Sequence, residues 1–309
     1  MMKVKNSTIN LCRRTLYESL SAETMVRFVR LVDPEYDLNE RSGIPQNIPI
    51  TNQMAAERIV EDIVADGRFI DFVEALVRVD SEGYMGRAYP IKGLGQIVKT
   101  LTLEGFLFDR STGQFFENTH ERASPDWGRL HDGDERQAAV LRLDVVANSV
   151  LVQQNALDKI EKAYAGLRTI VTRAVIGRFG RVWSWEGDGA LAAFMFGQKE
   201  RSAVLAGMEI LNELFFYNRL TNPLDSPLRV RIAAHAGPIR YRESLMELLK
   251  NDTLKDVIQI ESTATPTDTL SASSNLFLSI DRVIQDRFGP ESQADICKVR
   301  RYAVNLEKL

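Results

Sequence analysis

The chain of 309 residues is poor in cysteine and histidine, with two of the first and three of the second. Cys12 and Cys297 lie far apart and follow no ligand spacing, which excludes a disulfide framework, a zinc site and a patterned catalytic thiol. His120 and His131 lie in a polar stretch without partner ligands at metal spacing. The sequence therefore gives no sign of a metal centre built from cysteine or histidine.

Long apolar runs and a strong excess of one charge are also missing. No apolar stretch approaches the length of a membrane span, and the opening residues MMKVKNSTINLCRR lack the apolar core of a secretion signal. We therefore expect a cytoplasmic protein with no membrane partner. The net charge of −3 gives no strong field for phosphate, which argues against a nucleic-acid partner. With 44% hydrophobic and 26% charged residues, the chain has the composition and length for two cores.

The first 117 residues have the pattern of a helical bundle followed by a hairpin. Ser21 suits a helix N-cap, Gly67 suits the C′ position after the helix MAAERIVEDIVADG, and Gly113 suits the turn of the hairpin FLFDRSTGQFFE. The next helix carries its apolar face on Phe69, Phe72, Val73 and Leu76. We predict a mainly helical regulatory or interaction domain over 1–117, open to a protein partner, and a polar linker over 118–135.

Two aspartates follow in informative contexts. Asp144 ends the apolar run of AAVLRLDVVANS, which is typical of a buried strand. Asp188 lies in RVWSWEGDGALAAF, where strand-like residues flank a Gly-Asp-Gly turn, the pattern of a β-hairpin. Trp183 and Trp185 alternate with Ser184, so we expect both rings on one face of this hairpin. Two carboxylates at adjacent strand ends can hold hard divalent cations, although aspartate is also a common turn residue.

The order of elements around these aspartates narrows the fold. Apolar residues at three- and four-residue steps predict a helix from Leu157 to Val175, and a second helix with one face formed by Val204, Met208, Leu211 and Phe215. The strand LRVRIAAHAG begins at Leu228. Shorter strands are expected at Pro238 to Tyr241, at Asn275 to Ser279 and at VRRYAVNL near the C-terminus.

This series of segments resembles the catalytic domain of class III nucleotidyl cyclases, the adenylate and guanylate cyclases, over about residues 136–306. The resemblance is carried by VLRLDVVANS, GRVWSWEGDGALAAF, LRVRIAAHAGP, DVIQIESTATP and NLFLS, the last of which resembles the strand after the catalytic helix. It implies an α+β fold in which a cyclase-like domain with a ferredoxin-like βαββαβ core, residues 136–309, follows the smaller helical domain. The helical domain itself resembles in texture the small effector-associated domains of prokaryotic conflict systems.

The cyclase resemblance also implies a site. Asp144 and Asp188 would bridge two Mg²⁺ or Mn²⁺ ions, and a nucleoside triphosphate would be the substrate, in a head-to-tail homodimer. The backbone of Val145, Val146, Ala147, Asn148 and Ser149 would offer a carbonyl to metal and amides to phosphate. Asn148 and Ser149 also suit a helix N-cap, so their side chains are equally explained by capping. His235 matches a histidine of the family that is normally structural.

The sequence departs from the family at the base-reading and transition-state positions. Ser184 stands where purine cyclases place a base-selecting lysine. Alignment of DVIQIESTATP puts Gln259 and Thr263 at the positions of the catalytic asparagine and arginine, and Asp252 at a base-reading acid. Gln259 can donate a hydrogen bond, but Thr263 supplies no charge, and a lost transition-state cation costs several kcal/mol of barrier. A shifted alignment would bring in Arg240, Arg242 or Lys250.

Three interpretations therefore stay open. In the first, the chain is an active cyclase with an altered base preference, for instance for a pyrimidine nucleotide, which uses other cations supplied in trans. In the second, it is a catalytically inactive module of a signalling or defence protein that binds nucleotide or dimerises. In the third, only the fold is kept, and the two aspartates are turn residues.

Overall fold

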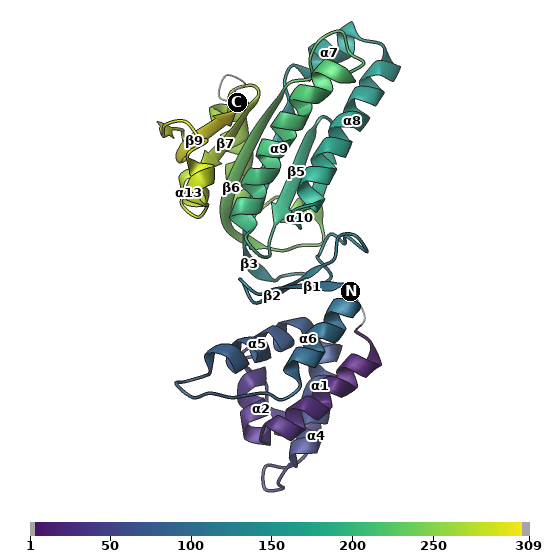
Figure 1. The fold of residues 1–309 in the computed structure, drawn as a ribbon, viewed down its shortest axis with the longest axis vertical. Helices are drawn as coiled ribbons and strands as arrows, with labels where there is room; N and C mark the ends of the chain where they lie inside the picture. Colours follow the sequence, from purple (N-terminus) through teal and green to yellow (C-terminus); the bar gives the residue numbers. More distant parts are fainter. Residues whose placement is uncertain (1–3, 305–309) are drawn as a thin grey trace. The chain divides into compact units, whose positions relative to one another are not determined.

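The computed structural model describes residues 4–304, and the chain divides into two compact units. The first consists of Met1–Arg122 with Asp126–Arg129, and the second of Ala123–Pro125 with Leu130–Leu309. Figure 1 shows the course of the chain through both. Among the described residues, no helix combines the length and the apolar composition needed to cross a bilayer.

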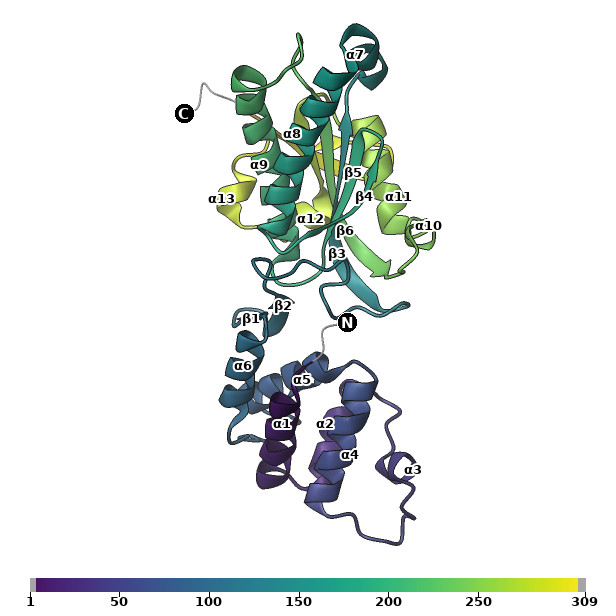
Figure 2. The same cartoon turned by 90° about the vertical axis from the view of Figure 1, so that its right-hand side faces the viewer.

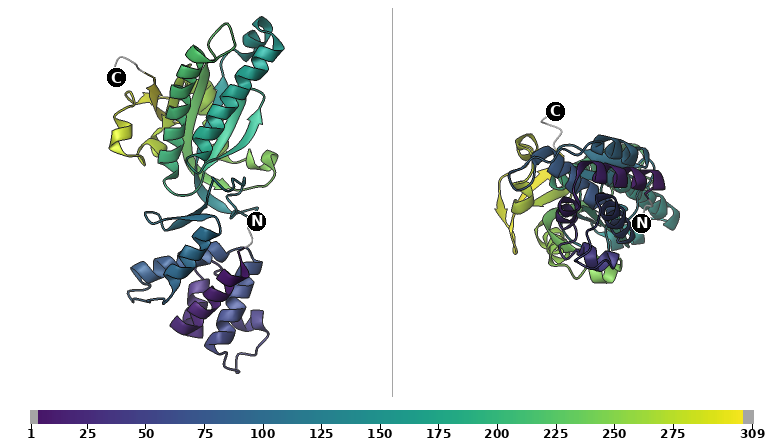
Figure 3. Two further views of the ribbon diagram at one scale, coloured as in Figure 1. Left: turned by 45° about the vertical axis from the view of Figure 1, so that its right-hand side comes forward. Right: turned by 90° about the horizontal axis from the view of Figure 1, so that it is seen from below.

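The first unit is a helical bundle with a two-stranded sheet, and its helices pack around one core (Figure 3). The Ser21 side chain accepts the amide of Thr24 at the start of the second helix, and Gly67 and Gly113 have positive φ, so the predicted cap, C′ glycine and hairpin turn are confirmed. Its elements are α1 (Asn6–Ser19), α2 (Ala22–Val29), α3 (Leu38–Ser42), α4 (Asn52–Ala65), α5 (Phe69–Glu82), α6 (Leu94–Leu103), β1 (Phe106–Asp109) and β2 (Gln114–Glu117).

The second unit is a seven-stranded sheet with helices, in the order β4-β5-β3-β6-β7-β9-β8. The first four strands of this unit and the two long helices between them form an antiparallel βαββαβ arrangement with the strand order of a ferredoxin-like fold, so the predicted α+β fold class is confirmed. The elements are β3 (Glu135–Val145), α7 (Asn148–Gln154), α8 (Leu157–Ile176), β4 (Arg181–Glu186), β5 (Gly189–Phe194), α9 (Lys199–Leu220), β6 (Val230–Arg240), α10 (Leu245–Leu248), α11 (Asp252–Gln259), η1 (Ile260–Ala264), β7 (Thr269–Ser273), α12 (Ser274–Phe277), α13 (Arg282–Gln285), β8 (Ser292–Gln293) and β9 (Lys298–Ala303).

One face of this sheet is apolar and is covered by α8 and α9 (Figures 1 and 2). Leu141 and Leu143 of β3 point into this core together with Ile232 of β6. Gly207 lets α9 approach the sheet closely, because a Cβ there would lie 3.0 Å from the side chain of Leu270. The alternation of a strand then directs the intervening residues of β3 and β6 to the opposite face.

That opposite face is polar and is packed by α11 and η1, which lie across the sheet from α8 and α9 in Figure 2. It carries the charged and hydroxyl side chains of the central strands, namely Arg142, Asp144, Arg231, His235, Ser271 and Ser273. η1 is a π-helical turn of five residues, a distortion that recurs at functional sites.

Two strand predictions need correction. Asn275 to Ser279 is not a strand: the neighbouring Leu276 and Phe277 are both buried, which suits a helical turn, and they lie in α12, while β7 directly before it is the strand. Pro238 to Tyr241 is no separate strand, because β6 continues through Arg240. The strand predicted near the C-terminus is confirmed as β9, and positions 305 and 306 of the predicted segment lie outside the described residues.

Candidate functional site

The two predicted metal aspartates lie at the same end of the strands: Asp144 at the C-terminal end of β3, and Asp188 in the turn between β4 and β5. The pairing of β3 with β5 ends at Leu143 opposite Ala190, so Asp144 is the next residue of β3 and Asp188 comes two residues before Ala190. Asp188 occupies the tight turn between β4 and β5, where Gly187 has φ +60°. The sequence places the acid at this tip because a glycine supplies the left-handed position beside it.

The charges of both carboxylates raise the pKa values of two neighbouring groups. Burial raises the pKa of the Tyr164 hydroxyl on α8, and the charges of Asp188 and Asp144 raise it further. Burial also raises the pKa of Glu261, where Arg231 opposes the effect and the two aspartates add to it. Asp144 and Asp188 therefore both lie within electrostatic range of Tyr164 and Glu261.

Arg231 joins two of these acids. Its Nη2 donates to Asp144 Oδ2 at 2.8 Å, across the β3–β6 pairing, and its Nε lies 2.8 Å from Glu261 Oε1. The second contact is close but poorly aligned, since neither of its atoms has a partner with hydrogen-bond geometry in residues 4–304. Glu261, from η1, is nearly buried, whereas Asp144 keeps 23% of its side chain exposed. Asp144 is thus the reachable end of this ion-pair chain.

A second arginine, Arg142, lies on the same face of β3 two residues before Asp144. Its guanidinium packs over the hairpin, because a Cβ on Gly189 would come within 2.7 Å of Arg142 Nη2. Its Nε is buried and donates to no acceptor within the part of the chain that the structure describes. The hairpin glycine after Asp188 therefore has a steric reason: it makes room for this side chain.

The segment after Asp144 turns sharply into α7. The amide of Val146 donates to the carbonyl of Arg229 at 2.8 Å, and Ala147 has φ +56°, a conformation that costs a non-glycine residue about 1 kcal/mol. Asn148 and Ser149 are the first helical residues, and neither caps the helix, since Ala147 holds the N-cap position without a side-chain bond. The Asn148 side chain instead accepts a hydrogen bond from the hydroxyl of Tyr164.

The carboxylates at these strand ends fit a hard cation whose remaining coordination positions are filled by a bound ligand. Among residues 4–304, no cluster of three or more acidic, histidine or cysteine side chains has metal-binding geometry. Mg²⁺, however, is commonly bound through one or two carboxylates, with substrate phosphates and water filling the remaining positions. Asp144 and Asp188 are the two carboxylates that would hold such an ion here.

The other predicted site residues lie elsewhere. Ser184 is buried on β4, and its Oγ has no hydrogen-bond partner among the described residues. Gln259 is exposed at the end of α11, and its backbone carbonyl accepts a hydrogen bond from the hydroxyl of Thr263 at 2.9 Å. Asp252 is exposed at the start of α11, where a hydrogen bond from Lys255 at 2.8 Å lowers its pKa. Thr263 is thus bound to its own helix and brings no charge.

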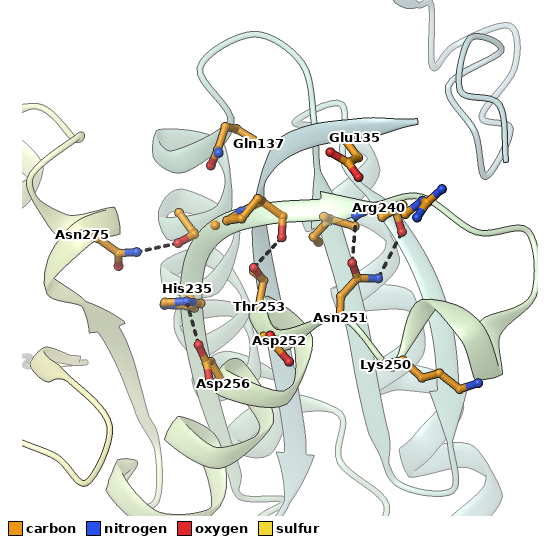
Figure 4. A pocket seen from close by; sticks show the side chains of 14 residues that line it. Glu135, Gln137, His235, Arg240, Lys250, Asn251, Asp252, Thr253, Asp256 and Asn275 are labelled. Carbon is orange, nitrogen blue, oxygen red and sulfur yellow. Dashed lines mark hydrogen bonds and ion pairs between the residues drawn. The ribbon is translucent and has the colours of Figure 1, made fainter. Parts of the chain in front are cut away.

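Asp252 lines a cleft of about 770 Å³ between α11 and the far halves of β3 and β6, shown in Figure 4. Asn251 fixes its rim, since its amide group pairs with the backbone N–H and C=O of Arg240 at 2.8 and 3.1 Å. Thr253 donates to the carbonyl of Pro238 at 2.7 Å. Arg240 and Lys250 provide positive charge in this cleft, away from the strand end that carries Asp144.

His235 lies at the inner wall of the same cleft. Its Nδ1 is 2.9 Å from Ser273 Oγ, and its Nε2 is 3.7 Å from Asp256. Ser273 is fully buried and also bonds to Asn275, so its hydroxyl cannot act as a nucleophile on a bound molecule. The arrangement is a structural network, which agrees with the expectation from the sequence that this histidine is structural.

Four residues of the site were not selected from the sequence: Arg142, Tyr164, Arg231 and Glu261. The two arginines carried a usable signal, since each interrupts an apolar strand at a position that shares a face with Asp144. Tyr164 fits the apolar face of a helix, and only the fold shows that its hydroxyl reaches Asn148.

Comparison with protein families found no match, and no curated protein matches the sequence. Solved structures of cyclase catalytic domains are similar in fold, at low sequence identity. The guanylyl cyclase domain of the RhoGC fusion protein from the fungus Blastocladiella emersonii is 13% identical over 56% of this chain and 98% of its own, with a TM-score of 0.46. The guanylate cyclase domain of RhGC from Catenaria anguillulae, in complex with GTP, is 14% identical over 55% and 96%, with a TM-score of 0.45. The adenylyl cyclase CyaB from P. aeruginosa is 12% identical over 57% and 98%, with a TM-score of 0.48.

Proposed function

We propose that the second unit is a divergent class III nucleotidyl cyclase, which forms a 3′,5′-cyclic nucleotide from a nucleoside triphosphate with an altered base preference. The observation that carries the proposal is the position of Asp144 and Asp188 at neighbouring strand ends of a βαββαβ sheet, where the charges of both reach Tyr164 and Glu261. These carboxylates would hold two Mg²⁺ or Mn²⁺ ions, which lower the pKa of a hydroxyl nucleophile and neutralise phosphate charge when bound.

In the reaction, the 3′-oxygen of the ribose attacks the α-phosphorus in line. The bond from the α-phosphorus to the bridging oxygen of pyrophosphate breaks, and the hydroxyl proton passes to solvent. The chain's own contribution is electrostatic: Arg231 lies directly beside Asp144, where it can face the triphosphate, and Glu261 holds it there. Asn148, held by the hydroxyl of Tyr164, fixes the start of the helix that follows Asp144.

The base-reading positions support a changed nucleotide preference. Ser184 is short, uncharged and buried, so it cannot make the contact that a lysine makes with a purine. Asp252 lies in the cleft of Figure 4 and not beside Asp144. Two such separate half-sites suit a head-to-tail homodimer, in which the base contacts come from the partner copy.

A second function has its own observation. In the structure Asp144 is already paired with Arg231, and Thr263 brings no cation, which favours a catalytically inactive module that binds nucleotide or dimerises. We also infer, from the sequence, that 1–117 is a regulatory or protein-binding domain joined through 118–135 to the cyclase-like domain of 136–309. The cytoplasmic location stays a prediction.

The test is direct. Purified full-length protein is incubated with each of the four nucleoside triphosphates and Mn²⁺ or Mg²⁺, and cyclic product is sought by mass spectrometry. Product from one triphosphate that disappears in Asp188→Ala supports the cyclase. No product from any triphosphate, from a protein shown to be dimeric, supports the inactive module. If the protein shows no specific Mn²⁺ binding, Asp144 and Asp188 are not metal ligands, and the interpretation of both as turn residues holds.

A further inference from the structure

Arg142 is a guanidinium at the candidate site with no assigned partner. It follows the alternation of β3 on the face of Asp144, and it packs against Gly189, the residue after Asp188. It therefore lies beside the strand ends that carry the two aspartates, within electrostatic range of Glu261. Arg231, by contrast, is engaged by Asp144 and Glu261.

A guanidinium has five donors and is always charged, so in a polar site it normally forms ion pairs or hydrogen bonds. No described side chain forms either with Arg142, and its Nε is buried without an acceptor. Glu261 lies within electrostatic range of Arg142, yet no carboxylate of the described residues forms an ion pair with it. This arrangement leaves the donors of Arg142 available to an anion that enters between Asp144 and Asp188.

The other cations near the second unit's polar face are committed elsewhere. Arg242 pairs with Asp132 at 2.6 Å. Arg240 and Lys250 line the cleft of Figure 4. Thr263, in η1, has no charge. Among the residues that the structure describes, Arg142 is thus an unengaged guanidinium near the aspartates that can face the charge developing on the transferred phosphate.

We infer that Arg142 supplies, from the same chain as the metal aspartates, the positive charge that stabilises the transition state. This inference rests on the proposed cyclase function. As the O3′–Pα bond forms and the bond to pyrophosphate breaks, charge builds on the phosphate oxygens, and preorganised donors aimed at them stabilise that state more than the ground state. Arg142 would be a catalytic residue in place of the cation that Thr263 does not provide.

The test separates transition-state from ground-state effects. Arg142→Gln and Arg142→Lys are compared with wild type for kcat and KM on the triphosphate that wild type converts. Calorimetry then measures binding of the matching 3′-deoxynucleoside triphosphate, which lacks the attacking hydroxyl. We expect Arg142→Gln to lower kcat by roughly 10²–10³-fold and to change the Kd of the deoxy analogue less than about threefold, with partial recovery in Arg142→Lys.

Gly189→Ala is an independent test, because the added Cβ would displace the Arg142 side chain without removing a charge. It should lower kcat in the same direction. Lys162→Gln on the exposed surface of α8 removes a charge far from this packing and serves as the matched control. Circular dichroism confirms folding of each variant.

The outcomes are distinct. If wild-type protein forms no cyclic product from any triphosphate, the proposed function is wrong. An active wild type whose kcat changes less than about threefold in folded Arg142→Gln overturns this inference alone. A variant that loses analogue binding and kcat equally would show that Arg142 serves ground-state binding, which also overturns the inference.

Discussion

Asp144 Oδ2 and Arg231 Nη2 lie 2.8 Å apart across the neighbouring strands β3 and β6. A carboxylate that faces open space at a strand end is thereby neutralised from within the sheet. A divalent cation that binds Asp144 must compete with this guanidinium, so Arg231 tunes how readily the edge accepts metal.

Replacing Arg231 by Met should therefore tighten Mn²⁺ binding by about 5–10-fold, because the competing charge is removed. Titration of nucleotide-free protein, followed by the electron paramagnetic resonance of free Mn²⁺, measures the effect. Asp144→Asn should abolish specific binding in the same assay. Weaker Mn²⁺ binding in a folded Arg231→Met protein would show that Arg231 does not compete with the cation.

His235 should make the second unit sensitive to acid. Burial lowers its pKa below the ordinary value of 6.5, against the opposing charge of Asp256. A histidine with a depressed pKa stabilises the fold above its unfolded pKa, and this stability is lost as the pH falls. The Tm of wild type should thus fall from pH 7 to pH 5. His235→Asn, which keeps a polar group toward Ser273, should flatten that slope in thermal scans; an unchanged slope would assign it to other groups.

Residues 126–129, within the segment expected from the sequence to be a linker, pack into the first unit, and Arg129 shows why. Its guanidinium is almost fully buried, forming ion pairs with Asp71 and Glu74 and donating to the carbonyl of Phe115 at 2.9 Å. Arg129→Met should destabilise the first unit by about 3–5 kcal/mol, because two carboxylates lose their counter-charge. Arg27→Met, which removes an exposed pair with Glu23, should cost less than about 1 kcal/mol. Urea unfolding of both variants compares the two, and equal losses would contradict the buried role.

Periodicity predicted the local elements well. The helix expected from Leu157 to Val175 is α8, Leu157–Ile176, because its apolar residues recur at helical spacing and meet the sheet. The Gly-Asp-Gly hairpin was readable because a tight turn needs glycine. The βαββαβ core was implied by the cyclase resemblance and not by periodicity, and the observed strand order agrees with it.

Alternation failed where the backbone is irregular. The register of β4 shifts between Val182 and Ser184, so Trp183 and Trp185 do not share surroundings as a regular strand would predict. Trp185 packs against the core, whereas Trp183 Nε1 donates to the carbonyl of Pro125 at 3.4 Å. A bulge of one residue leaves no clear mark in the sequence.

The site was predictable only in its carboxylates. Asp144 and Asp188 stand in contexts that a pattern can recognise. Glu261 reaches them from more than 70 residues further along the chain, through a π-helical turn. Its effect depends on the packing of η1 over β3 and β6, which no local pattern specifies.

Gly207 offers a test of how closely α9 packs on the sheet. A Cβ at this position would lie 3.0 Å from both terminal carbons of Leu270 and 3.4 Å from Leu141, so neither side chain can move away without disturbing the core. Gly207→Val should destabilise the second unit by about 1–3 kcal/mol through overpacking. Gly95 in α6 meets no atom within 4 Å, and Gly95→Ala should instead stabilise the first unit by about 0.5–1 kcal/mol through helix propensity. Chemical denaturation of both variants provides the measurement. A neutral Gly207→Val would mean that α9 can shift away from β3 and β7, and the polar face that carries Asp144 and Arg231 would then rest on a less rigid sheet than its packing indicates.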